Sequence, residues 1–124
     1  MKIFRHDHEL PPAIEKWGWK FHHIGIPTSD KMPGERYLPH LKFYTSGFDN
    51  SPFGIEWMRF EDDCPLHELI KTVPHVAFKV QNLDEELDRN NFKILSYPNS
   101  PGSGVRVAMI EHSGAPVELM EFEQ

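Results

Sequence analysis

The sequence predicts an α+β fold in which one strand-rich unit occurs twice. Residues 117–123 repeat residues 55–61, and four of the seven positions are identical. A segment in which small and apolar residues follow a histidine precedes each copy, at residues 23–26 and 75–78. Because a histidine segment followed by a glutamate segment recurs in the same order, we expect two related modules in the chain.

The two glutamate segments alternate as strands do. Successive side chains of a strand point to opposite faces of a sheet. Glu56 therefore shares a face with Met58 and Phe60, and Glu118 shares a face with the Met and Phe of its own segment. We interpret the pattern as a sheet with an apolar face that carries helices and a second face, the cup, that holds the His and Glu side chains.

The histidine segments have the opposite arrangement of apolar residues. Their large apolar side chains fall on the other face, which leaves His23 beside Gly25 and His75 beside Ala77, with room for each imidazole. His22 falls on the apolar face and is expected to be a packed histidine. Since adjacent residues point to opposite faces, only one of His22 and His23 is expected to reach the cup.

Two carboxylates buried among Met and Phe need compensation. An unpaired buried charge costs several kcal/mol, against a total stability of about 5–15 kcal/mol for a domain. A divalent cation would supply it, because imidazole and carboxylate ligands suit Zn, Ni, Co, Mn or Fe(II). The alternative is that both glutamates face water on half-exposed strands. The predicted metal ligands are His23, Glu56, His75 and Glu118.

Length and composition restrict the number of domains, the classes of partner and the expected location of the protein. The 124 residues suit one domain, with 39% hydrophobic and 26% charged residues. A net charge of −6 argues against nucleic acid or an anionic membrane as partner. The single Cys64 excludes an intramolecular disulfide. Since neither a signal-peptide pattern nor a spanning segment is evident, a cytoplasmic protein is expected.

The first part of the chain has weaker patterns than the second. A short helical pattern follows Pro11 and Pro12, as is typical of a helix start. The polar run at residues 6–9 resembles a metal cluster, but a solvated terminal segment is the favoured reading. Pro33 and Gly34 interrupt any helix, so a short helix or a loop is expected there. The predicted elements are a strand at 21–28, a short helix or loop at 29–39, a strand at 40–46, a turn at 47–52 and a strand at 53–60.

The second part has the order β-α-β-β-β. Asn82 precedes acidic residues, which predicts a capped helix at residues 82–89. The Gly- and Pro-containing residues 98–104 lack a phosphate-binding motif and are expected to form a loop at the rim of the cup. The other expected elements are a helical turn at 65–70 and strands at 73–80, 92–97, 105–111 and 116–122. The His-to-Glu spacing is ten residues shorter in the first module, where a helix corresponding to 82–89 is missing.

These residues resemble the vicinal oxygen chelate superfamily, which includes glyoxalase I, methylmalonyl-CoA epimerase, extradiol dioxygenases and bleomycin resistance proteins. The resemblance covers roughly residues 20–123. It implies two βαβββ modules that form an incomplete barrel around a divalent metal, the first module here having a shortened helix. It also implies one domain over residues 1–124, with an extension at 1–20, a first module at 21–61 and a second at 73–123.

The same resemblance assigns roles to the four candidates. His23, Glu56, His75 and Glu118 match the family's four metal-ligand positions. A complete set is most similar to glyoxalase I and its isomerase relatives, whereas extradiol dioxygenases use two histidines and one carboxylate, without a ligand at the position of Glu56. Glu56 and Glu118 are the expected catalytic residues, and the resemblance further implies a small-molecule substrate and a homodimer.

The predicted function is that of a metal-dependent lyase or isomerase. A substrate with two adjacent oxygens would chelate the metal, and Glu118 or Glu56 would move a proton. The alternatives are a ring-cleaving Fe(II) dioxygenase and a drug-binding or resistance protein without turnover, whose pocket the aromatic residues could line. The matched residues do not include those with which glyoxalases hold glutathione, so the substrate is left open.

Overall fold

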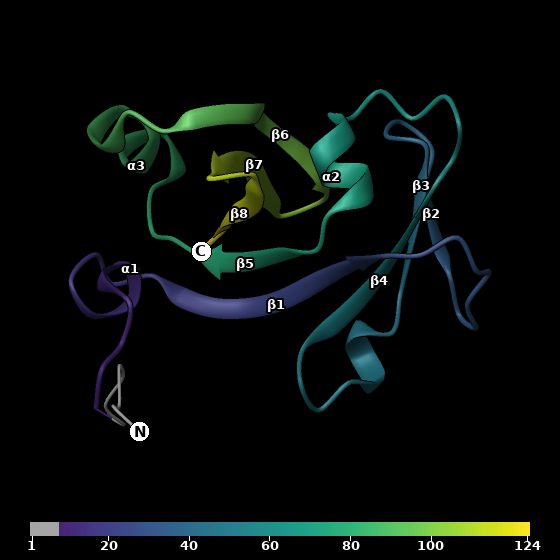
Figure 1. The fold of residues 1–124 in the computed structure, drawn as a ribbon, viewed down its shortest axis with the longest axis horizontal. Coiled ribbons are helices and arrows are strands. Elements are labelled where there is room, and N and C mark those ends of the chain that lie inside the picture. The colour runs from purple at the N-terminus through teal and green to yellow at the C-terminus, as the bar shows by residue number, and fades with distance from the viewer. Residues whose placement is uncertain (1–7) are drawn as a thin grey trace, which may run out of the picture.

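A single curled sheet of eight strands dominates the computed structural model, which describes residues 8–124 (Figure 1). The strand order is β2-β3-β4-β1-β5-β8-β7-β6. The strands are β1 (Lys20–Pro27), β2 (Arg36–Leu38), β3 (Phe43–Ser46), β4 (Ile55–Phe60), β5 (His75–Lys79), β6 (Lys93–Gly102), β7 (Val105–His112) and β8 (Ala115–Phe122). The helices are α1 (Pro12–Glu15), α2 (Glu68–Thr72) and α3 (Leu83–Asn90), with a 3₁₀ turn at Phe48–Asn50.

The sheet consists of two halves with the same internal pairing. In the first half, β1–β4, strand β1 pairs in parallel with β4; in the second half, β5–β8, strand β5 pairs in parallel with β8. The antiparallel pair of β1 and β5 joins the halves at the centre of the sheet. This arrangement confirms the expected α+β fold with an incomplete barrel.

Helix α3 covers the outer face of the second half. Its Asn82 cap forms as expected, with the side-chain oxygen accepting a hydrogen bond from the amide of Glu85 at 3.0 Å. Leu83 of this helix is fully buried against the outward-facing side chains of the sheet. The buried residues of this cluster are Trp19, Val80, Leu83, Ala108, Ile110 and Leu119. The prediction of an apolar face that carries a helix is therefore confirmed for the second half.

The first half has no helix between β1 and β2 among the described residues, in agreement with the weak pattern there. The connecting loop is instead fixed by Glu35, whose carboxylate accepts two hydrogen bonds from Arg59 at 2.8 Å each. The Arg59 guanidinium in turn lies 4.1 Å from the centre of the Tyr44 ring. An ion pair at the outer face thus holds the segment that a helix occupies in the second half.

Three element boundaries differ from the sequence expectation. The strand predicted at 40–46 begins only at Phe43, after a turn with Lys42 at φ 57°, and β2 forms at Arg36–Leu38, where a short helix or loop was expected. Strand β6 continues through Gly102, where a loop was expected, because it lies at the sheet edge and its pairing with β7 is irregular enough to accept prolines. Helix α2 begins three residues later than expected and is capped by the His67 side chain. None of the helices in residues 8–124 is long and apolar enough to cross a membrane.

Candidate metal centre

His23 and His75 lie on the two central strands, each opposite a small residue of the other half. In the antiparallel register of β1 and β5, His23 pairs with Ala77 and His75 pairs with Gly25. Both histidines are 3% exposed. A Cβ added at Gly25 would stand 2.1 Å from Cε1 of His75, so the imidazole occupies the space that any larger residue would need. The sequence predicted that small neighbours make room for the imidazoles, and Gly25 does so for His75.

Glu118 brings a carboxylate between the two imidazoles. It lies on β8 beside Ala77 of β5, and its Oε1 is 3.2 Å from Nε2 of His23 and 3.2 Å from Nε2 of His75. One ligand atom from each of these three residues falls within 4.8 Å of the others. Two nitrogens and one oxygen at this spacing form a cluster that could hold a metal ion.

Glu56 stands next to this cluster rather than inside it. It lies on β4 opposite Gly25, and its Oε1 is 3.9 Å from Nε2 of His23. The sequence thus brings four candidate side chains to one face of the sheet, three of them in the tight cluster. The assignment of all four as metal ligands stays a prediction.

The two carboxyl groups have opposite pKa shifts. Burial favours a raised pKa for Glu118, but the contacts with His23 and His75 outweigh it and lower the pKa to about 2. For Glu56, burial raises the pKa above the usual value, and the neighbouring His23 offsets this only in part. Glu118 is therefore expected to be ionised near neutral pH, whereas the pKa of Glu56 lies above the ordinary carboxyl value.

The donor atoms fit a divalent cation. Nε2 of His23 is buried and has no well-directed hydrogen bond within residues 8–124, although it lies near the Glu118 carboxylate. Buried polar atoms without a partner are uncommon, and a cation bound between Nε2 of His23 and the Glu118 carboxylate would give both atoms a partner. Imidazole nitrogen with carboxylate oxygen suits the borderline transition metals.

His22 corrects one expectation from the sequence. It was expected to face away from the cup, but a register shift between Phe21 and His23 brings its ring to 5.1 Å from that of His23. The two Nδ1 atoms are 2.8 Å apart, and the His22 ring stacks on Phe48 with 3° between the planes. Simple alternation fails here because a bulge inserts a residue into the strand. The contact engages Nδ1 of His23 and leaves Nε2 directed at Glu118.

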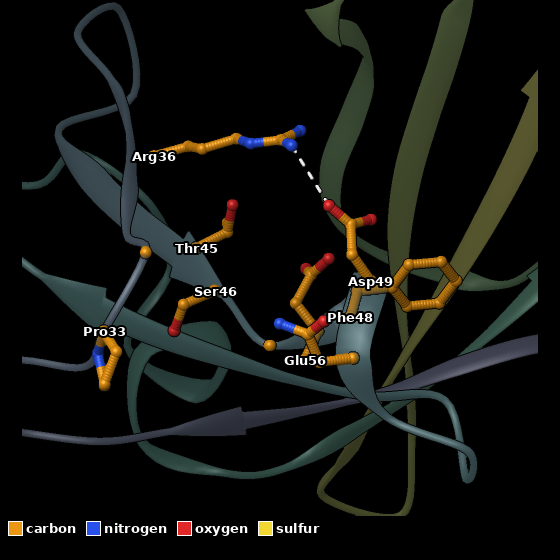
Figure 2. A pocket seen from close by; sticks show the side chains of 10 residues that line it. Pro33, Arg36, Thr45, Ser46, Phe48, Asp49 and Glu56 are labelled. Carbon is orange, nitrogen blue, oxygen red and sulfur yellow. Dashed lines mark hydrogen bonds and ion pairs between the residues drawn. The ribbon is translucent and has the colours of Figure 1, made fainter.

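A polar cavity of about 190 Å³ opens beside Glu56 (Figure 2). Arg36 and Asp49 form an ion pair at its edge, with 3.0 Å between nitrogen and oxygen. Other polar lining residues are Thr45, Ser46 and Asn50. A second, smaller cavity of about 50 Å³ borders His75 and Glu118 and has mainly apolar walls. The smaller apolar cavity therefore borders the cluster itself, whereas the polar cavity borders Glu56 beside it.

Of the polar run at residues 6–9, His8 and Glu9 are not among the three clustered residues. His6 and Asp7 lie outside the described residues, and His8 and Glu9 are exposed. The solvated reading of the run stays a prediction.

Comparisons with known proteins identify the fold. No family model and no curated protein matches the sequence. A hypothetical protein, BH1468, from Bacillus halodurans C-125 has a similar structure, with 20% identity, a TM-score of 0.66 and coverage of 86% of this chain and 96% of that chain. Methylmalonyl-CoA epimerase from Mycobacterium tuberculosis is also similar, with 17% identity, a TM-score of 0.61 and coverage of 85% and 89%. The chain shares the fold of these two proteins, in agreement with the incomplete barrel expected from the sequence.

Proposed function

We propose that the protein is a metal-dependent lyase or isomerase that moves a proton on a small substrate bound through two adjacent oxygens. The observation that carries this proposal is the convergence of His23, His75 and Glu118 within 4.8 Å on the concave face of the sheet. The fold shared with an epimerase supports the same reaction class.

The three clustered residues would hold the cation through Nε2 of each histidine and the Glu118 carboxylate. When bound, the cation supplies Lewis-acid stabilisation of negative charge on the substrate oxygens. Glu118 suits a ligand because its pKa is held low, so it stays ionised and acts as a constant anion.

Glu56 is the better placed of the two carboxylates to move the proton. It borders the polar cavity of about 190 Å³, and it stands at the edge of the cluster instead of between the histidines. A carboxylate in this position can take an α-proton and return it to the neighbouring carbon or the opposite face, a contribution of about 10²–10⁴-fold in rate. Glu118 would then serve mainly as ligand, although the sequence alone left either glutamate as the base.

Metal content and proton exchange test the proposal together. Tag-free wild type should contain about one equivalent of a transition metal, and His75→Ala and Glu118→Ala should lose it while remaining folded. The loaded protein should then exchange the α-proton of a 2-oxoaldehyde thiol adduct or an acyl-CoA with solvent deuterium, and Glu56→Gln should stop this exchange. Absence of metal after reconstitution, or unchanged turnover in both Glu56→Gln and Glu118→Gln, would contradict the proposal.

A ring-cleaving dioxygenase is the second candidate. The tight cluster has two histidines and one carboxylate, with Glu56 outside it, and this is the ligand set of many non-haem Fe(II) oxygenases. Oxygen uptake by the Fe(II)-loaded protein in the presence of a catechol would favour this candidate. Ligand binding that survives chelation of the metal would instead favour a binding protein without turnover.

The proposed assembly is a homodimer. Its support is the resemblance to the superfamily. Light scattering during size-exclusion chromatography should give twice the mass of the 14.5 kDa chain.

A further inference from the structure

We propose that the small cavity beside His75 and Glu118 binds a short alkyl group of the substrate. The substrate class is then a two-oxygen metal chelator with an unbranched chain of about one to three carbons on one side and a polar remainder on the other. This inference rests on the proposed function, because the chelating oxygens place the alkyl group.

The cavity adjoins the metal cluster and is lined in part by buried apolar side chains of both halves. His75 and Glu118 form part of its wall. Phe43 and Met58 line it from the first half, and Met109 lines it from β7; each of these three is only 6% exposed. A group that projects from a chelated substrate toward Met109 would therefore leave water.

The polar side chains in the wall are few, and the Asn99 amide among them already has hydrogen-bond partners, whereas Nδ1 of His75 has none within residues 8–124. The amide nitrogen of Asn99 donates to Oγ of Ser96 at 3.3 Å and to the carbonyl of Tyr97 at 3.0 Å. An alkyl group that enters the cavity leaves the Asn99 bonds intact and meets mainly apolar side chains, whereas a polar group would lose its contact with water there. The chemistry of the walls thus selects an apolar occupant next to the chelating oxygens.

The size of the cavity limits that occupant. Its volume is about 50 Å³, and an apolar protein cavity that accepts benzene measures roughly 150 Å³. A short chain fits, and an aromatic ring does not. The polar cavity beside Glu56, with Arg36 and Asp49 at its edge, is available to an oxygen-rich remainder.

Alkyl hydroxamates test this inference without turnover, because they chelate metals through two oxygens and vary only in the attached group. Titration calorimetry on the zinc-loaded protein would compare acetohydroxamate, propionohydroxamate, butyrohydroxamate and benzohydroxamate. We expect affinity to rise about fourfold for each added CH₂ group. Benzohydroxamate should bind at least about tenfold more weakly than butyrohydroxamate.

Two truncations separate the cavity from general packing. Met109→Ala should improve benzohydroxamate relative to butyrohydroxamate by about tenfold, because the cavity becomes large enough for a ring. Met120→Ala is the matched control, since Met120 is buried on the same face but does not line the cavity. Val107→Ala, a smaller change in the cavity wall, gives a second variant if Met109→Ala does not fold.

The outcomes distinguish this inference from the proposed function. Equal or tighter binding of benzohydroxamate by wild type, or an unchanged ratio in the folded cavity variants, overturns the alkyl site while the metal centre stands. Failure to bind metal at all overturns the proposed function and the alkyl site with it. A rise in affinity with chain length that Met109→Ala extends to the aromatic ring supports both.

Discussion

Both halves of the sheet place a histidine and a glutamate in the cup, but different elements cover their outer faces. The second half packs α3 against its outer face, with Leu83 fully buried. The first half has a loop held by the Glu35–Arg59 ion pair in the corresponding place. His23 and His75 nevertheless have the same burial and approach the same carboxylate. The comparison shows that ligand placement depends on the central strands β4, β1, β5 and β8 more than on what covers them.

The largest effect on the similar placement of the two histidines is expected from Gly25→Ala. The new Cβ would lie 2.1–2.7 Å from ring atoms of His75, so the imidazole must rotate away from Glu118. We expect metal affinity to fall by more than about 100-fold, the upper range for lost orientation of a ligand. Chelator competition measures this. Gly102→Ala is the control, because a Cβ there meets nothing within 4 Å. Retained affinity in Gly25→Ala would show that His75 is not a ligand.

The helix cover of the second half can be weakened with Leu83→Ala. This side chain is 0% exposed, and Leu-to-Ala changes at such sites cost about 2–5 kcal/mol. Urea unfolding should report this loss, while the remaining folded protein keeps its metal affinity. A matching loss of affinity in the folded fraction would contradict the view that the strands alone position the ligands.

A smaller effect is expected from His22→Phe, which keeps the stacking on Phe48 but removes the contact with Nδ1 of His23. We expect metal affinity to fall about 10- to 100-fold with little change in thermal stability. His22→Asn, which can restore a hydrogen-bond partner, should recover part of the affinity. His40→Ala, at an exposed histidine outside the cluster, serves as a control. Equal affinities in all of these proteins would limit His22 to a packing role.

The smallest effect is expected at the first half's ion pair, with Glu35→Gln. Hydrogen bonds from Arg59 lower the pKa of Glu35 below its ordinary value of 4.5. Because the folded pKa is the lower one, this stabilisation is present above the unfolded pKa and disappears as pH falls through the folded pKa. Urea unfolding should therefore show wild type to be the more stable near neutral pH, and the difference should shrink as the pH falls below the ordinary carboxyl pKa. A difference that persists in acid would point to packing rather than charge.

Much of this site follows from alternation in the sequence. The repeat of residues 55–61 at 117–123 places Glu56 and Glu118 on corresponding strands, and the small partners of His23 and His75 mark the face that holds them. Strand β2, the extension of β6 and the rotation of His22 were not predictable in this way. Each depends on a turn or a bulge whose cause is pairing with a neighbouring strand, and local patterns do not contain that information.

The register of β1 and β5 also couples the stability of the two halves. Each half contributes the small residue that accommodates the other half's histidine, so neither ligand keeps its position when the halves separate. An ion bound to His23 and to His75 and Glu118 would act as a crosslink between segments about 50 to 95 residues apart in the chain. At 1,000 times its dissociation constant, such a ligand adds about 4 kcal/mol to the free energy of unfolding. With the ion bound, the helix-covered half and the loop-covered half would unfold together, as one cooperative unit.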